Sequence, residues 1–409
     1  MDDAERIEQI RALEELKAAA AAAQAVVTAD FVASQRAQQR AAGVPDRHLG
    51  KGVAAQVALA RRESPHRGSR LVGLAAALVH EMPATMAALQ AGEISEWRAT
   101  LVARETACLT REDRQAADAE LAGRLGELGD GQVEAAARAV AYRLDPYAFT
   151  ARSQGAVRDR RVTLRPAPDT MSRLSGFLPV AQGVAAFAAL SREADALRAA
   201  GDARSRGQIM ADTLVERLTG QATAAAVPVQ VELVMTDRAL LSGADEPAHL
   251  VGLGPIPAPI ARDLARDSDA PVWLRRVFAR PDDGALVAME SRRRLFPDRL
   301  RQFLILRDQT CRTPWCGAPI RHADHVVPVE AGGVTGAENG QGLCEACNHT
   351  KQAPGWRARP SPASAGHAVE VTTPTGHTYT SRPPPAPGRR SRARPLAAAR
   401  SDISPLDAA

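Results

Sequence analysis

The sequence predicts a mainly α-helical chain with α+β parts: an N-terminal helical domain, a mixed α/β middle region and a small ββα domain near the C-terminus. Three observations support this fold class. Alanine, leucine and valine must fill an interior with only 3% aromatic residues, and Ala-rich packing favours helices. Alternating strand patterns appear only after about residue 158. Four of the five cysteines gather between residues 311 and 347.

A chain of 409 residues is long enough for two or three domains, and changes of pattern place their boundaries. The last residues are rich in proline and arginine and lack core-forming side chains, which predicts disorder. The expected units are a helical domain (1–150), its mixed α+β continuation (151–296), the ββα domain (297–358), a terminal hairpin (359–382) and a disordered basic tail (383–409).

The N-terminal domain begins with one long helix, expected over residues 4–42. Ile7, Ile10, Leu13 and Leu16 lie three residues apart and predict its apolar face, which continues through Val26, Val27, Phe31 and Val32. Three clean heptads are lacking, so packing within one domain is favoured, while a homodimer stays open. A turn is expected at residues 64–68, followed by helices that end near residue 143.

The middle region alternates between strand and helix patterns. A strand at 160–165 is expected to pair with 172–178, and residues 227–236 form the best strand pattern in the chain. Phosphate loops, nucleophile elbows and paired carboxylates are not found in residues 1–290. The sequence therefore assigns no chemistry to this part and leaves a protein-partner role open. Further helices are expected at 184–200, 205–218, 258–266 and 272–279, and a strand at 285–289.

Composition indicates the cellular compartment of the chain and the kind of partner that it binds. The N-terminus is acidic, and the apolar run at residues 71–79 is too short for a bilayer, so neither a signal peptide nor a membrane span is expected. Cys108 has no partner and the other cysteines resemble metal thiolates, which favours a reducing cytoplasm. The formal charge of +5 is compatible with an anionic partner such as DNA.

The cysteines form two close pairs. Cys311 and Cys316 are separated by four residues, and Cys344 and Cys347 by two. Two such pairs on either side of a small loop are the usual way to hold one tetrahedral Zn²⁺. Taken alone, this spacing also fits a zinc knuckle without any catalysis.

A second group of polar residues lies between and after the cysteine pairs. Asp324 and His325 end a short strand, while Asn348 and Lys351 fall on one face of a helix, at i and i+3. A carboxylate and a carboxamide suit a hard divalent cation such as Mg²⁺. A neutral imidazole beside them suits a general base that takes a proton from water.

This order of residues resembles the HNH endonucleases, which are small ββα-metal nucleases. Their pattern is a strand ending in D-H, a loop ending in Asn and a helix beginning C-x-x-C-[HN]-x-x-K. The resemblance implies His325 as general base, Asp324 and Asn348 as ligands of a catalytic Mg²⁺ or Mn²⁺, and Asn339 as the residue that orients the base or braces the loop. His349 is an alternative ligand. The four cysteines would hold a separate structural zinc.

The likeness extends over nearly the whole chain. Residues 54–62, 95–99 and 252–257 resemble bacterial HNH proteins that carry a long domain of unknown function before the nuclease, and the stretches around 297–311 and 373–379 are similar too. The activity implied is hydrolysis of DNA phosphodiester bonds that leaves 5′-phosphate and 3′-hydroxyl ends. The alternative function is a zinc-stabilised DNA-binding protein that does not cut.

A dense group of arginines flanks the expected nuclease. Between Arg292 and Arg321 there are eight arginines against two aspartates, Asp298 and Asp308. Such density suits a phosphate backbone, although an ordinary solvated face would look the same. The expected DNA contacts are Arg292, Arg293, Arg294, Arg307, Arg312, Arg321 and Lys351.

Overall fold

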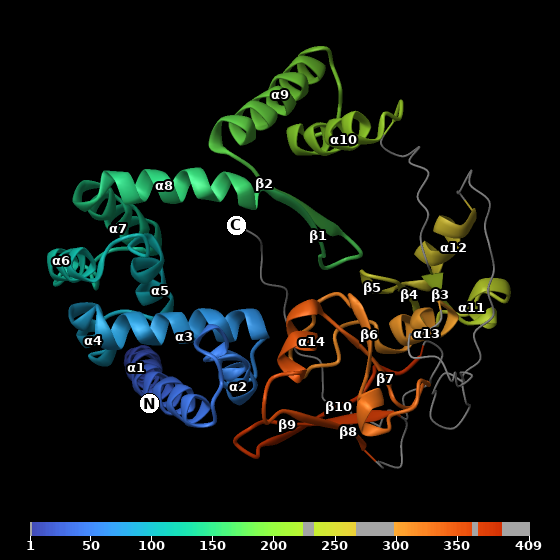
Figure 1. The fold of residues 1–409 in the computed structure, drawn as a ribbon. Coiled ribbons are helices and arrows are strands. Elements are labelled where there is room, and N and C mark those ends of the chain that lie inside the picture. Colours follow the sequence, from blue (N-terminus) through green and yellow to red (C-terminus); the bar gives the residue numbers. More distant parts are fainter. Residues whose placement is uncertain (1, 224–232, 267–297, 362–366, 387–409) are drawn as a thin grey trace.

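The computed structural model describes residues 2–223, 233–266, 298–361 and 367–386. Helices dominate the described residues, and the strands form small sheets in the middle and C-terminal parts (Figure 1). The expected mainly α fold class with α+β parts is confirmed. The expected basic tail falls almost entirely on residues 387–409, outside the described part.

The N-terminal part is a bundle of helices around one apolar core. Leu78, Met82, Leu89 and Leu121 are among its fully buried side chains. A buried carboxylate ties two helices together, because Asp118 accepts hydrogen bonds from Thr85 through both the backbone N–H and the hydroxyl. The helices are α1 (Asp3–Ala41), α2 (Val53–Ala60), α3 (Pro65–His80), α4 (Pro83–Gln90), α5 (Glu96–Glu105), α6 (Arg111–Leu121), α7 (Asp130–Leu144) and α8 (Pro146–Ala156), with 3₁₀ turns at Asp46–His48 and Val157–Asp159.

The expected apolar face of α1 is wrong in the first half of the helix. Ile7, Ile10, Leu13 and Leu16 are each 60–63% exposed, whereas a row of small residues is buried against α3 and α4: Ala18, Ala22, Ala25 and Ala29. Alanine at i, i+4 and i+7 lets helix backbones approach closely, and this contact decides which side faces the core. Among the described helices, α1 is also the single helix long and apolar enough to cross a bilayer, judged by length and composition.

The start of α3 corrects a second expectation. Residues 64–68 were expected to form a turn, but the helix begins there, at Pro65. The Ser64 hydroxyl accepts a hydrogen bond from the Arg67 N–H, and proline is well suited to the first helical position because it has no N–H to leave unpaired. Ser95 caps α5 in the same way, because its hydroxyl accepts a hydrogen bond from the Arg98 N–H.

The middle region starts with a β-ribbon. Strand β1 (Arg161–Pro166) pairs antiparallel with β2 (Ser172–Phe177), as expected. Of the expected strand at 227–236, residues 227–232 lie outside the described part, as do the helix at 272–279 and the strand at 285–289. The remaining elements are α9 (Val180–Ala199), α10 (Arg206–Thr219), β3 (Leu233–Val234), α11 (Asp237–Leu241), β4 (Ala248–Leu250), β5 (Gly254–Ile256) and α12 (Ala258–Arg266), with β3, β4 and β5 in one antiparallel sheet.

The C-terminal part has the expected two strands and a helix. Strand β6 (His322–His325) pairs antiparallel with β7 (Gly340–Leu343), and α14 (Glu345–Lys351) follows directly. Before them α13 (Asp298–Asp308) packs on β7 and β6. A 3₁₀ turn at Val329–Ala331 lies in the loop between the two strands. The expected terminal hairpin is present as β9 (Ala368–Thr372) and β10 (Thr378–Ser381), and β8 (Arg357–Ser361) adds a third strand on β9.

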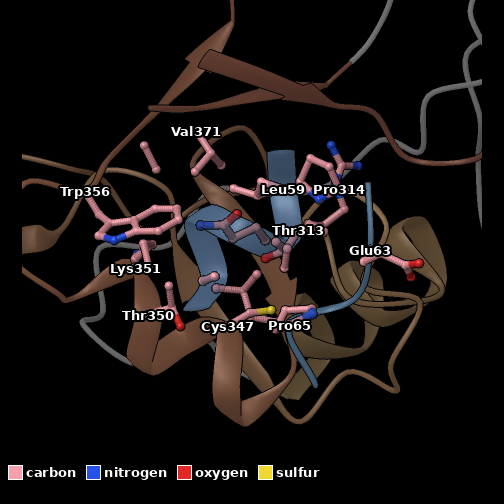
Figure 2. Close-up of a pocket in the computed structure, with 16 residues that line it drawn as sticks. Leu59, Glu63, Pro65, Thr313, Pro314, Cys347, Thr350, Lys351, Trp356 and Val371 are labelled. Carbon is pink, nitrogen blue, oxygen red and sulfur yellow. The ribbon is translucent and has the colours of Figure 1, made fainter. Parts of the chain in front are cut away.

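The helical part and the C-terminal part touch through α2. A Cβ atom on Gly52, the residue before α2, would lie 2.6 Å from the indole nitrogen of Trp356. The Thr375 hydroxyl donates to the buried side chain of Gln56, 3.1 Å away. Figure 2 shows the cavity left between the two surfaces, with Leu59 on one side and Cys347 on the other. This close packing fixes α2 against the nuclease-like domain.

Candidate active site and zinc cluster

The four cysteines expected to bind zinc meet at one point. Their sulfur atoms all lie within 4.8 Å of one another, and Cys316 Sγ is 3.7 Å from the sulfurs of both Cys344 and Cys347. A tetrahedron with Zn–S bonds of about 2.3 Å has edges of about 3.8 Å. The spacing therefore fits one zinc ion held by four thiolates.

Local backbone structure places these sulfurs. The first pair sits on a tight turn in which Trp315 and Gly317 have positive φ angles, and Cys316 N–H donates to Thr313 O. The second pair lies at the start of α14, where Cys344 is the residue before the first helical turn. Hydrogen bonds from the neighbouring thiols, Cys311 first, lower the pKa of Cys344. A thiolate in the cluster favours a cation.

A seam between β6 and α14 brings together the polar residues expected to bind the catalytic cation. His322 and Asp324 point to the same face of β6 because they are two residues apart. From α14, the amide nitrogen of Asn348 lies 3.3 Å from His322 Nδ1, and Lys351 forms an ion pair with Asp324. Asp324 and Asn348 therefore share one seam, as a common metal site needs.

Two oxygen atoms on this seam fit a hard cation. Asn348 Oδ1 is a buried side-chain acceptor without a hydrogen-bond donor, and the buried Asp324 Oδ2 is ion-paired with the Lys351 ammonium. Buried acceptors rarely go unsatisfied, and one carboxylate with one carboxamide is a donor set that Mg²⁺ or Mn²⁺ accepts. Because the amide nitrogen of Asn348 faces His322, its oxygen is the atom left to face a cation.

His325 lies at the end of β6, half-buried. Its Nε2 is 2.7 Å from the hydroxyl of Thr335, which is itself buried. Burial lowers the pKa of His325, the Asp324 charge raises it and the Lys351 charge lowers it. The ring is thus held in place and favours the neutral form that a general base needs near neutral pH.

Asn339 braces the loop that follows His325. Its carboxamide accepts from Val327 N–H at 2.8 Å and donates to the carbonyls of Val327 and Val334. A Cβ atom at Gly333 would lie 1.9 Å from Val327 O and 2.7 Å from the Asn339 amide nitrogen, so only glycine fits there. Of the two roles expected for Asn339, these contacts favour bracing of the loop.

His349 lies away from the seam. Its side chain is 59% exposed, and Nε2 is 4.0 Å from Glu345 on the outer side of α14. The neighbouring Asn348, in contrast, contacts β6. The alternative in which His349 replaces Asn348 as a ligand is therefore not supported by the geometry.

Two of the arginines expected to contact DNA are internal. Arg307 and Arg312 are only 7% and 3% exposed, and both side chains bond to the buried carboxylate of Asp308. Arg307 also donates to the carbonyls of Ala337 and Gly340. The expected phosphate contact is wrong for both, because a buried guanidinium with several internal acceptors holds the fold together.

The other residues expected to contact DNA differ in their exposure. Lys351 is half-buried and donates to the backbone carbonyl of His325 besides its ion pair with Asp324. Arg321 is exposed. Arg292, Arg293 and Arg294 lie outside the described residues. Among the expected contacts in the described part, Arg321 alone presents an exposed side chain.

His322 and Thr335 are site residues that the sequence reading missed. His322 fixes the amide of Asn348, and Thr335 holds the ring of His325. Strand alternation could have found His322, because it places residues two apart on one face. Thr335 comes from the loop, and no spacing rule links a loop residue to a strand end.

The cavity in Figure 2 is distinct from this seam. Its walls include Cys347, Thr350 and Lys351 of α14, but not Asp324, His325 or Asn348. Leu59 and Pro65 of the helical part also line it, and Pro65 lies beside Cys347. We regard the cavity as a packing gap between the two parts of the chain, and the seam as the candidate active site.

Comparison with known proteins agrees with the motifs. Residues 10–308 match the family described as "Domain of unknown function (DUF222)", and residues 310–353 match "HNH endonuclease". The "Uncharacterized protein Rv3776" of Mycobacterium tuberculosis (strain ATCC 25618 / H37Rv) is 33% identical over 142 residues, 34% of this chain and 25% of that protein. The match thus spans a quarter of the relative's length. No solved structure matches. The architecture expected from the resemblance is confirmed.

Proposed function

Because the chain belongs to the DUF222 family and ends in an HNH endonuclease domain, we propose that it is a metal-dependent endonuclease that hydrolyses phosphodiester bonds in DNA. One observation carries the proposal. The seam between β6 and α14 holds two buried oxygen acceptors, on Asp324 and Asn348, and His325 follows Asp324 at the end of β6, close enough for the Asp324 charge to raise its pKa. That combination serves a cation and a base acting on one phosphate.

The residues divide the work as follows. Asp324 and Asn348 would hold a Mg²⁺ or Mn²⁺ ion, which would supply positive charge beside the phosphate. His325 takes a proton from the attacking water, and the Thr335 hydroxyl keeps its ring in place. Asn339 keeps the loop after His325 in one conformation. The four cysteines hold a structural zinc behind α14, which also carries Asn348.

The competing function is a zinc-stabilised DNA-binding protein that does not cut. Such a protein would need the cysteine cluster for its fold, but the two buried acceptor oxygens on the seam would have no role in binding a cation. The ion pair between Lys351 and Asp324 would then be a permanent structural contact. Nicking of plasmid DNA in Mg²⁺ or Mn²⁺, compared with EDTA, separates the two functions.

Metal affinity tests the roles of Asn348 and His322 without any measurement of cleavage. Asn348→Ala removes a ligand oxygen, and His322→Ala removes the group that turns that oxygen toward the seam. Loss of such an outer partner costs about 10–100-fold in metal affinity. We expect His322→Ala to weaken Mn²⁺ binding in that range and Asn348→Ala to weaken it at least as much, measured by titration calorimetry of zinc-loaded protein.

His349→Ala is the matched control for these variants. It also removes a side chain from α14, but one that lies on the exposed side of the helix. Mn²⁺ binding should be unchanged in this variant. If His349→Ala lost Mn²⁺ affinity while Asn348→Ala kept it, the ligand assignment would be reversed.

A further inference from the structure

The ribbon formed by β1 and β2 stands apart from every core. Figure 1 shows it projecting from the junction of α8 and α9. All of its residues are exposed except Thr163, which is half-buried. A two-stranded ribbon alone is at best marginally stable in water, so this element gains from a partner.

The register of the ribbon sorts its side chains onto two unlike faces. Residues directly opposite each other across an antiparallel pair point to the same side, and successive residues alternate. One face, which we call the arginine face, carries Arg161 opposite Phe177, Thr163 opposite Ser175, and Arg165 opposite Arg173. The other face is apolar and carries Val162, Leu164 and Leu174.

The arginine face carries uncompensated positive charge. It has three arginines and no acidic residue, and within the described part of the chain no carboxylate lies in ion-pair range of them. Arg165 and Arg173 face each other directly, and like charges in that position destabilise a ribbon. Arg161 lies over the Phe177 ring, 4.9 Å from its centroid. An anion on this face would remove the repulsion.

We propose that the arginine face is a docking surface for the phosphate backbone of duplex DNA. The proposal rests on the proposed function in taking DNA as the partner. Arginine, threonine and serine are side chains that bind phosphate oxygens, and together they fill five of the six positions on this face. A ribbon with strands about 4.8 Å apart also fits the major groove, which is about 12 Å wide.

The nuclease domain itself gives a reason for a second contact surface. Arg307 and Arg312 are internal, and Lys351 is engaged with Asp324. Arg321 is left as the exposed cation among the expected contacts in the described part. The ribbon supplies three more cations from the DUF222 region, to which no chemistry was assigned.

The test is the salt dependence of DNA binding. The variant carries Arg161→Gln, Arg165→Gln and Arg173→Gln, and binding of a labelled duplex by the full chain is followed by fluorescence anisotropy without divalent cations. Each lost phosphate contact reduces the slope of log affinity against log salt by about 0.9, so three should reduce it by about 2.7. Affinity near 0.1 M salt should fall about 10²-fold.

A matched control removes the same charge from neighbouring helices. Arg204→Gln, Arg206→Gln and Arg217→Gln lie on or next to α10, and their side chains are already paired with Asp202, Asp195 and Glu193. This triple variant should keep the wild-type slope. Equal slopes for the two triple variants, or a wild-type chain that does not bind the duplex, would overturn the proposal. So would a change of oligomeric state in the ribbon variant alone, measured by sedimentation, because the ribbon would then join two copies.

The outcome for the ribbon is separable from that for the nuclease. If the wild type binds DNA through the ribbon but does not nick it, the ribbon proposal stands and the proposed cleavage fails. If the wild type nicks DNA and the ribbon variant binds like the wild type, cleavage stands and the ribbon proposal fails. In a nicking assay the ribbon variant should need more DNA for half-maximal rate while its maximal rate is unchanged.

Discussion

His325→Ala should cut DNA about 10²–10⁴-fold more slowly than the wild type, the usual range for losing a positioned general base. The variant should still fold, because His325 is only half-buried at the end of β6. Zinc content and DNA affinity should stay at the wild-type level, since neither the cysteine cluster nor the ribbon is touched. Nicking rates, zinc analysis and anisotropy on the same preparation measure all three.

Two outcomes would contradict this account of His325. Cutting at the wild-type rate would show that another group takes the proton. A melting temperature lowered together with zinc loss would show that the residue is structural. Thr335→Val is a useful companion variant, because it removes the hydroxyl that holds the ring and keeps nearly the same shape. It should slow cutting less than His325→Ala does.

Cys344→Ala should fail in a different way, with zinc, cutting and DNA binding by the nuclease domain lost together. The C-terminal domain has little apolar core of its own: the cluster around the zinc site consists mainly of the cysteines themselves and Leu343. A structural zinc is worth about 10–16 kcal/mol in small zinc domains, far more than the net stability of an ordinary domain. Without it β7 and α14 should unfold locally.

Elemental analysis and thermal melting decide this second prediction. The wild type should contain close to one zinc per chain, and acid should release it because thiolates must be deprotonated to bind the ion. Cys108→Ala is the control, since Cys108 packs beside the helical core and not in the cluster. A Cys344→Ala variant that keeps its zinc and melts like the wild type would refute the structural role.

Short-range spacing made the grouping of the candidate site residues predictable. The cysteine pairs, Asp324 next to His325, and Asn348 with Lys351 on one helix face are all set by a few residues of local sequence. Strand alternation and helix periodicity fix such relations before any tertiary contact forms. The β1–β2 pairing was predictable for the same reason, because a short connection joins two alternating runs.

What the sequence could not show depends on tertiary contacts. In the sequence Arg307 and Arg312 look like exposed cations of an arginine-rich segment. Only the tertiary structure shows that both side chains are buried and hydrogen-bonded to Asp308. The spacing of apolar residues predicted that Ile7 and Leu13 lie on the buried side of α1. Instead, the alanines of α1 pack closely against α3 and α4, so another side of the helix is buried. The contact between Thr335 and His325 joins a loop to a strand end, which no local pattern encodes.

Plasmid nicking with and without a divalent cation tests the central claim most directly. Zinc-loaded wild-type protein is incubated with supercoiled plasmid in Mg²⁺ or Mn²⁺, in EDTA, and in EDTA followed by excess cation, with zinc content checked after each step. The account predicts nicked circles with cation, none in EDTA, recovery when cation returns, and a cutting rate lowered about 10²–10⁴-fold for His325→Ala. Zinc-loaded protein that binds the plasmid but never nicks it would contradict the account and leave a DNA-binding protein without cleavage.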